Sequence, residues 1–377
     1  MTTTRFVALD ALRGLILALM ILVNTPGSWS AVYSPLLHAD WHGFTFADLV
    51  FPGFLFVVGA AMFFALKTQA WSAASVKKVL RRTLLMFVLG LGLNFLWTPD
   101  LSQMRLMGVL QRIALCYGLA ALLVLALKPW FTGAKQQYLM PLFGALLLAF
   151  YWLLLQLGGP APYSLEGNIV GVIDRALLGE HRLYQGFGMP FDPEGLLSTL
   201  GAVVNVLLGY WVAGELSQRQ PKAGMLWLLA VGALMLLLSQ LLAPIWPVNK
   251  ALWTGSYVLQ STGLLLGLLA LMVWLVDIRN FAFIAEPLRV YGSNPLFIYI
   301  LSWCWTVLLS KVLVWQVAGV GSTGGTENTM SAYQWLYQLL QSGLADKPAS
   351  LLFALLHVGL FWFISYVLYR RQIFIKI

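Results

Sequence analysis

The apolar residues of this chain fall into runs of about twenty, separated by shorter segments that hold most of the charged and turn-forming residues. A helix of that length crosses the hydrocarbon core of a bilayer. Ten such runs predict ten membrane-spanning helices, at residues 8–24, 46–66, 80–97, 106–127, 138–158, 195–214, 224–244, 254–276, 290–314 and 350–369. The predicted fold class is therefore all-α: a polytopic integral membrane protein whose residues 1–377 form one transmembrane domain.

Composition agrees with this pattern, because 60% of the residues are hydrophobic and only 10% are charged, against about a quarter charged in a soluble domain. A soluble enzyme is thereby excluded. The net charge of +9 does not indicate a nucleic-acid partner, since Lys and Arg form short clusters rather than one basic face. Cys116 and Cys304 lie within apolar runs, so neither a disulfide nor a metal site is predicted.

The distribution of positive charge predicts that both termini are cytoplasmic. With a cytoplasmic N-terminus, the cytoplasmic segments hold fifteen basic residues: Arg5, Lys67, Lys77, Lys78, Arg81, Arg82, Lys128, Lys135, Arg219, Lys222, Arg279, Arg289, Arg370, Arg371 and Lys376. The opposite segments hold only five: Arg105, Arg175, Arg182, Lys250 and Lys347. This imbalance satisfies the positive-inside rule.

Three long outer segments are predicted, at 25–45, 159–194 and 315–349. Their acidic residues could attract a cationic ligand or simply be solvated. The third segment combines a glycine-rich flexible turn at Gly319–Gly325 with a short amphipathic stretch at Tyr333–Leu340. No internal repeat supports an inverted-repeat transporter. The chain has no N-x-S/T sequon, which favours a bacterial inner membrane.

Ionisable residues within membrane spans indicate functional sites, because burying a charge in lipid is costly. Asp10 and Arg13 share one helical face, so they form an ion pair, or else Arg13 binds an anion from the cytoplasm. Gln111 and Arg112 lie inside the fourth span, where Arg112 must face protein or water. Its role is structural or ligand-binding.

Two of the four histidines, His38 and His42, lie just before the second span. Because the unperturbed pKa of histidine is nearest neutrality, such a residue suits a general base for an amine nucleophile. Asn24, at the outer end of the first span, could hydrogen-bond the imidazole or an oxyanion. His38 and His42 also have zinc-like spacing, but no third His or Cys lies nearby, and no metal is predicted.

Two further polar positions have structural and functional interpretations. Asn249 and Lys250 lie among aromatic residues at the entry of the eighth span. They belong either to an interfacial aromatic belt, in which the lysine snorkels to the surface, or to a functional site. Asn294, before Pro295, could cap a broken helix that lines a cavity, or an ordinary helix.

Taken together, several short stretches resemble the heparan-alpha-glucosaminide N-acetyltransferase family and its smaller bacterial relatives. They are Leu9–Gly14, Val23–Asn24, His38–Gly43, Ala47–Pro52, Gly108–Arg112, Ile173–Arg175, Phe191–Gly195 and Pro247–Lys250, in the family's order. The resemblance implies that acetyl-CoA in the cytoplasm supplies an acetyl group to the amine of a glucosamine or glucosamine-containing saccharide on the far side of the bilayer. His38 matches the family's catalytic histidine and Asn24 its partner asparagine.

We expect the remaining polar residues of these stretches, with Asn294, to bind the substrate or acetyl-CoA: Asp10, Arg13, Asp40, Trp41, His42, Asp48, Gln111, Arg112, Asp192, Glu194, Asn249, Lys250 and Asn294. Asp40 is expected to favour the charged imidazole of His38. The stretch between Asn24 and His38 is longer than in the eukaryotic enzyme. The resembling stretches do not include the large lumenal domain that precedes the first span of the eukaryotic enzyme. A free amino sugar or a short cell-wall fragment is therefore the expected acceptor.

Three questions stay open at this stage. Acetyl could pass directly to the sugar, or could first rest on His38 as an acetyl-imidazole. The chain could instead be a permease for amino sugars or muropeptides, in which the same polar residues line a path. A homodimer is one option for the oligomeric state.

Overall fold

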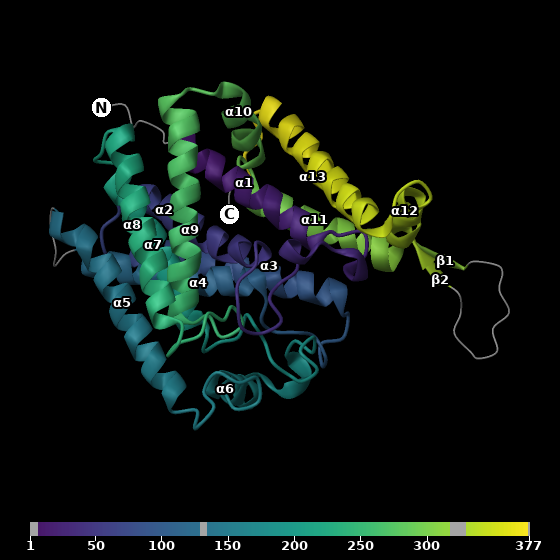
Figure 1. Cartoon of the computed structure of the whole chain (residues 1–377), viewed down its shortest axis with the longest axis horizontal. Coiled ribbons are helices and arrows are strands. Elements are labelled where there is room, and N and C mark those ends of the chain that lie inside the picture. Colours follow the sequence, from purple (N-terminus) through teal and green to yellow (C-terminus); the bar gives the residue numbers. More distant parts are fainter. Residues whose placement is uncertain (1–6, 129–133, 317–328, 376–377) are drawn as a thin grey trace.

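The computed structural model describes residues 7–128, 134–316 and 329–375, and these are almost entirely helical (Figure 1). The helices are α1 Val7–Asn24, α2 Val50–Leu66, α3 Ala73–Trp97, α4 Val109–Leu127, α5 Ala134–Gln156, α6 Ile169–Leu178, α7 Thr199–Leu216, α8 Pro221–Leu242, α9 Gly255–Met272, α10 Ala282–Tyr291, α11 Pro295–Val307, α12 Ala332–Gln341 and α13 Asp346–Arg370. Short π-helical turns, η5 Val273–Ile278 and η6 Leu308–Val312, extend α9 and α11. Strands β1 Val314–Gln316 and β2 Thr329–Ser331 pair antiparallel.

The predicted fold class is confirmed: among the described residues, ten helices are long and apolar enough to cross a membrane. Two span starts differ most from the sequence prediction. The third span begins at Ala73 instead of residue 80. The ninth begins at Pro295, because Gly292 and Ser293 separate it from the short helix α10.

Helix α7 lies at the centre of the main helix group and is buried along nearly its whole length. It packs against α2, α4, α5 and α9. Gly59 of α2 and Gly209 of α7 permit this packing: a Cβ at Gly59 would lie 1.9 Å from the Val206 carbonyl oxygen, and one at Gly209 would lie 2.0 Å from that of Phe56. Small residues let membrane helices approach closely in this way.

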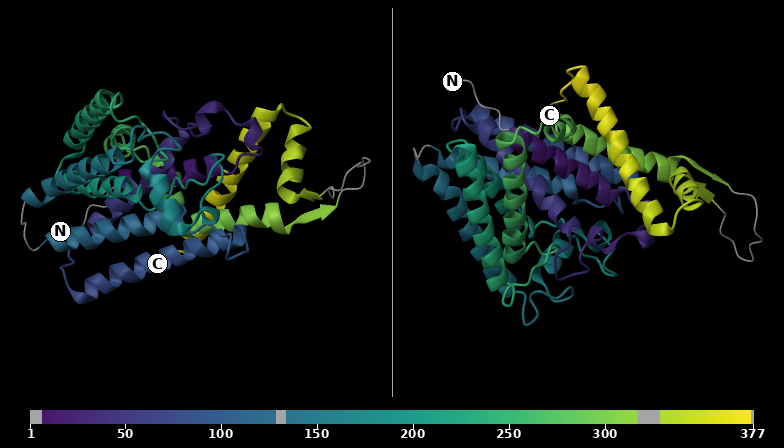
Figure 2. Two further views of the ribbon diagram at one scale, coloured as in Figure 1. Left: turned by 90° about the horizontal axis from the view of Figure 1, so that it is seen from below. Right: turned by 45° about the horizontal axis from the view of Figure 1, so that its top comes forward.

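A second group places α1 against α10, α11 and α13, with α12 packed on α13. Figure 2 shows α12 and α13, in yellow and green, on the opposite side of the molecule from α5 and α8. Helix α12 coincides with the predicted amphipathic stretch, and its capping box joins Ser331 to Gln334. The predicted flexible turn at Gly319–Gly325 lies outside the described residues.

Four connections meet at one end of the main helix group, which we call the loop end. They join α1 to α2, α3 to α4, α5 to α7, and α8 to α9, and they gather beside α6 in the lower part of Figure 1. Gly43 N–H donates to the Val248 carbonyl over 2.9 Å, and Leu106 N–H donates to the Arg182 carbonyl over 3.3 Å. These contacts bring distant parts of the chain into one polar layer.

Candidate active site

The loop end positions His38 through a buried carboxylate. Asp48 lies in the 3₁₀ turn Ala47–Leu49 that leads into α2, and it is fully buried. Its Oδ1 lies 2.8 Å from Nδ1 of His38, whereas Oδ2 accepts hydrogen bonds from the backbone N–H groups of Ala39 and Thr45, over 3.1 and 3.0 Å. Because the carboxylate can only accept, His38 carries its proton on Nδ1, and Nε2 is the unprotonated ring nitrogen that Asp48 does not engage. The His38 side chain is 48% exposed, so a substrate can reach it.

Lys250 completes this group, which we call the histidine cluster (His38, Asp48 and Lys250). Its Nζ lies 2.9 Å from Nδ1 and 3.0 Å from Nε2 of His38, and 3.5 Å from Oδ1 of Asp48. The Lys250 side chain is 16% exposed. Burial lowers the pKa of its ammonium group, although Asp48 opposes that shift. The chain therefore places an amine of reduced basicity beside the candidate base.

Beside the cluster, the buried Asn249 fixes His42. The Oδ1 of Asn249 accepts from Leu252 N–H over 2.7 Å, so its Nδ2 donates to Nδ1 of His42 over 3.3 Å. Burial lowers the pKa of His42, which favours its neutral form. Trp41 donates from Nε1 to the Tyr163 carbonyl over 2.7 Å and packs at 5.3 Å against the ring of Phe191.

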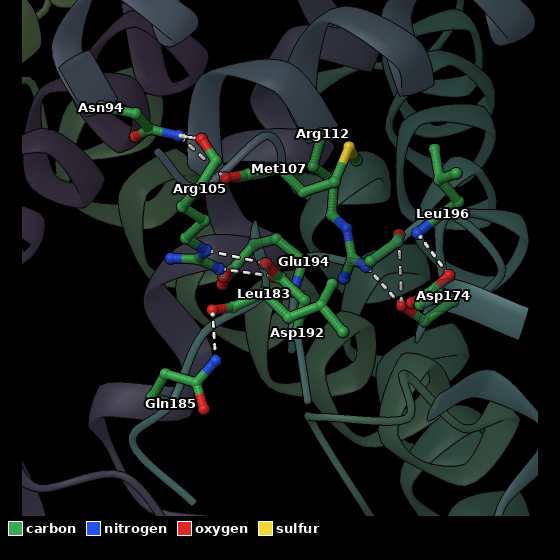
Figure 3. Close-up of polar contacts among 12 residues, drawn as sticks. Asn94, Arg105, Met107, Arg112, Asp174, Leu183, Gln185, Asp192, Glu194 and Leu196 are labelled. Carbon is green, nitrogen blue, oxygen red and sulfur yellow. Dashed lines mark hydrogen bonds and ion pairs between the residues drawn. The ribbon is translucent and has the colours of Figure 1, made fainter. Parts of the chain in front are cut away.

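A second polar group, the arginine cluster, consists of Arg105, Asp192 and Glu194 (Figure 3). Asn94 holds the loop that carries Arg105, since its Nδ2 donates to the Arg105 and Met107 carbonyls over 2.8 and 2.9 Å. Arg105 donates from Nε to Oδ2 of Asp192 over 2.8 Å and from Nη2 to Oδ1 over 2.5 Å, and Nη2 also pairs with Glu194. Burial opposes its charge, but the two carboxylates raise the pKa of Arg105.

Sequence reasoning placed Asp192 and Glu194 among the substrate-binding residues and treated Arg105 only as a charge of an outer loop. In the structure, both carboxylates are occupied by Arg105, which is therefore the residue that the sequence analysis missed. The sequence did contain a signal for this ion pair: Asp192 and Glu194 lie two residues apart at the entry to a membrane span. Two carboxylates at such a position need a cation as partner.

Arg112 lies next to the arginine cluster and is fully buried. It donates to the Gly195 carbonyl over 2.8 Å and to the hydroxyl of Ser198, and its guanidinium carbon lies 5.0 Å from the ring centroid of Trp253. These contacts hold the turn that precedes α7, and a ligand-binding role of Arg112 stays a prediction. Asp174 accepts from two backbone N–H groups of the same segment, at Leu196 and Leu197 (Figure 3). Burial raises the pKa of Asp174 to about 6.

Other predicted site residues lie apart from the histidine cluster. Asp10 and Arg13 form the expected ion pair, 2.9 Å long, in the first turns of α1. Asn294 binds the backbone of the C-terminal segment, because its Nδ2 donates to the Ile373 carbonyl and its Oδ1 accepts from Ile375 N–H. Gln111 is buried against α3, where its Oε1 would lie 2.4 Å from a Cβ at Gly90.

Asn24 and Asp40 are both exposed, and among the described residues neither side chain contacts His38. For Asp40 this is a correction, because the carboxylate bound to His38 is Asp48. The reason is that Asp48 begins a buried helix under the loop, whereas Asp40 points out of it. The catalytic role of Asn24 stays a prediction.

The fold and these clusters define a polytopic α-helical membrane protein with a histidine, a carboxylate and a lysine joined at one end of its helices. The family model described as heparan-alpha-glucosaminide N-acetyltransferase, catalytic, matches residues 5–156, which include His38 and Asp48. The human heparan-alpha-glucosaminide N-acetyltransferase is 26% identical over an alignment that covers 99% of this chain and 60% of the relative. The mouse protein of that name is 28% identical, over 79% of this chain and 53% of the relative.

The resemblance inferred from the short sequence stretches is thereby confirmed as a similarity, because the family model and both relatives carry the name heparan-alpha-glucosaminide N-acetyltransferase. The chain spans about 60% and 53% of the length of these two relatives.

Proposed function

We propose that this protein is a transmembrane N-acetyltransferase, which moves acetyl from cytoplasmic acetyl-CoA to the amine of glucosamine or a glucosamine-containing saccharide on the periplasmic side of a bacterial inner membrane. The observation that carries the proposal is the 2.8 Å contact between His38 Nδ1 and Asp48 Oδ1. It orients a half-exposed imidazole whose Nε2 is not engaged by the carboxylate and can act as the proton acceptor. The names of the matched family and relatives support the acetyl group as the cargo.

The chemistry needs a base for the amine proton and a donor for the oxyanion that forms when the amine attacks the thioester carbonyl. His38 Nε2 is the base, and Asp48 stabilises the imidazolium that results. Lys250 is the closest cation to the reacting position, and Asn24 is the candidate oxyanion donor carried over from the sequence resemblance. Asp40 and Trp41, in the same loop as His38, remain candidates for contacts with the sugar.

On this proposal, acetyl-CoA approaches from the opposite end of the bundle. A cleft of about 490 Å³ lies there, between the start of α1, the α7–α8 turn and α10, and its lining includes Arg219, Arg289 and Asn280. Each arginine already pairs with a glutamate of its own helical region, at 2.5 Å. Guanidinium groups suit the phosphates of CoA, so exchange of a glutamate partner for a phosphate would admit the donor.

The deciding experiment gives the detergent-purified protein labelled acetyl-CoA and glucosamine. Formation of labelled N-acetylglucosamine supports the proposal. The matched variants are His38→Ala, which should lose the product, and His181→Ala, a loop histidine outside the cluster, which should keep it. If wild type forms no product and sealed vesicles containing the protein take up unmodified glucosamine, the permease is the better assignment.

The proposed direction of transfer depends on the orientation inferred from positive charge. A reporter that is active only outside the cytoplasm, fused after Ile377, should stay silent, and the same reporter inserted after Gly343, in the third outer segment, should be active. The reverse pattern would place His38 in the cytoplasm and refute transfer across the membrane.

A further inference from the structure

Lys250 Nζ occupies the position that a substrate amine would need. It lies 3.0 Å from Nε2 of His38, which is hydrogen-bonding distance from the unprotonated nitrogen of the candidate base. Among the described residues, Lys250 is the one lysine whose amine contacts His38. The polar lining of the site thus contains a primary amine in the place where the proposed reaction acetylates one.

The surroundings of Lys250 also favour reaction over a purely electrostatic role. Its side chain is largely buried, and burial lowers the pKa of the ammonium group, which increases the share of the nucleophilic neutral amine. Its one carboxylate neighbour in the histidine cluster, Asp48, is 3.5 Å away, and the same oxygen is engaged by His38 at 2.8 Å. Lys250 therefore shares Asp48 with His38 and makes the longer of the two contacts with that carboxylate.

We propose that Lys250 is an internal acceptor, which is acetylated on Nζ when acetyl-CoA is bound and no amino sugar is present. This inference rests on the proposed acetyltransferase function. The ammonium first loses a proton to solvent, and the neutral amine attacks the thioester carbonyl. His38 Nε2 then takes one N–H proton from the tetrahedral intermediate, the carbon–sulfur bond breaks, and the CoA thiolate receives that proton from His38. The products are Nε-acetyl-lysine and the free thiol of CoA.

The product would be an end point, because an amide, unlike a thioester, does not pass its acetyl group to a sugar amine under these conditions. Acetylation would also remove the positive charge beside Asp48 and His38 and fill the acceptor position. The protein would thus lose activity during prolonged exposure to acetyl-CoA alone, and an amino sugar would protect it by occupying the same place.

The experiment incubates the full-length detergent-purified protein with deuterium-labelled acetyl-CoA, with and without glucosamine, and maps labelled lysines by mass spectrometry of chymotryptic peptides. Label should accumulate on Lys250 in excess over Lys347, which lies over the exposed ring of Tyr33, and over Lys222 of α8. Glucosamine should suppress this label. Both His38→Ala and the bulkier His38→Gln should reduce it by roughly 100-fold or more, the usual contribution of a general base.

The outcomes separate this inference from the proposed function. If the protein acetylates glucosamine while Lys250 stays unlabelled, the internal acceptor is refuted and the proposed function stands. Equal label on Lys250, Lys347 and Lys222 would indicate non-enzymatic acetylation and would also refute it. Labelled Lys250 without acetylated glucosamine would uphold the internal acceptor and reject glucosamine as the substrate. Loss of both reactions would reject both proposals.

Discussion

His38 and Arg105 both lie in connections at the loop end, yet their side chains are held in opposite ways. The histidine cluster is partly exposed, and its base keeps one ring nitrogen unused by the carboxylate. In the arginine cluster, the carboxylate of Asp192 is fully buried and receives two parallel hydrogen bonds from one guanidinium group. The comparison indicates that spare hydrogen-bonding capacity at an accessible position marks the candidate for chemistry, whereas a saturated buried pair marks a structural element.

The largest expected effect is on turnover, through His38→Ala. Removing the base should lower acetyl transfer by roughly 100-fold to 10,000-fold. The thermal stability of the variant should change little, because the side chain is half exposed. His42→Ala, measured in the same assay, should lose less activity, since His42 is held by Asn249 outside the histidine cluster. Near wild-type turnover in the His38 variant would show that another residue is the base, and would contradict the assignment of chemistry to the histidine cluster.

Substitutions in the arginine cluster should instead lower the stability of the folded protein. Arg105→Gln leaves Asp192 and Glu194 buried without a cation, a change that costs about 3–5 kcal/mol in comparable buried pairs. We expect a clearly lower melting temperature in detergent. The matched control is Arg175→Gln, which removes a long 3.4 Å hydrogen bond to the Pro190 carbonyl and no ion pair seen among the described residues, and which should melt like the wild type. Equal melting temperatures for both variants would show that the cluster contributes little to folding.

A third prediction uses pH. Because burial raises the pKa of Asp174 to about 6, the folded protein binds this proton more tightly than the unfolded chain. Its contribution to stability is therefore fully present below the unfolded pKa of about 4 and is lost as pH rises through about 6, with a total of about 3 kcal/mol. The melting temperature should fall between about pH 4 and pH 7. Asp174→Asn should flatten this fall, and an unchanged slope would exclude Asp174 as its origin.

The last comparison is between the two carboxylates near His38, and its Asp40 variant has the smallest expected effect. Asp48→Asn removes the charge that orients and stabilises the imidazolium, so turnover and its pH profile should both change. Asp40→Asn should leave the pH profile close to that of the wild type, because Asp40 is exposed and makes no contact with His38 within the described residues. The same amino sugar must be used throughout, since its own ammonium titrates. A shifted profile in the Asp40 variant with an unaltered one in the Asp48 variant would reverse this assignment.

The sequence alone determined the helical organisation of this protein. The thickness of the hydrocarbon core demands apolar runs of a set length, and the ten predicted spans correspond to the ten long apolar helices of the described residues. The motif around His38 likewise identified the candidate base, since residues close in sequence stay close in space. The ion pair of Asp10 with Arg13 belongs to the same class, because one helical turn brings the two side chains together.

Only the tertiary structure decided which polar residues act together. Lys250 reaches His38 across 212 positions, and Arg105 reaches Asp192 across 87, through loops whose paths follow from the packing of the helices they join. Asp40 is nearer to His38 in sequence than Asp48 is, yet Asp48 holds the imidazole, because it is buried at the start of α2 while Asp40 faces outward. Hydropathy is a property of single segments, and it determines where each membrane-spanning helix lies in the sequence. The pairing of charges depends on three-dimensional distance and burial, which arise only when the segments pack together.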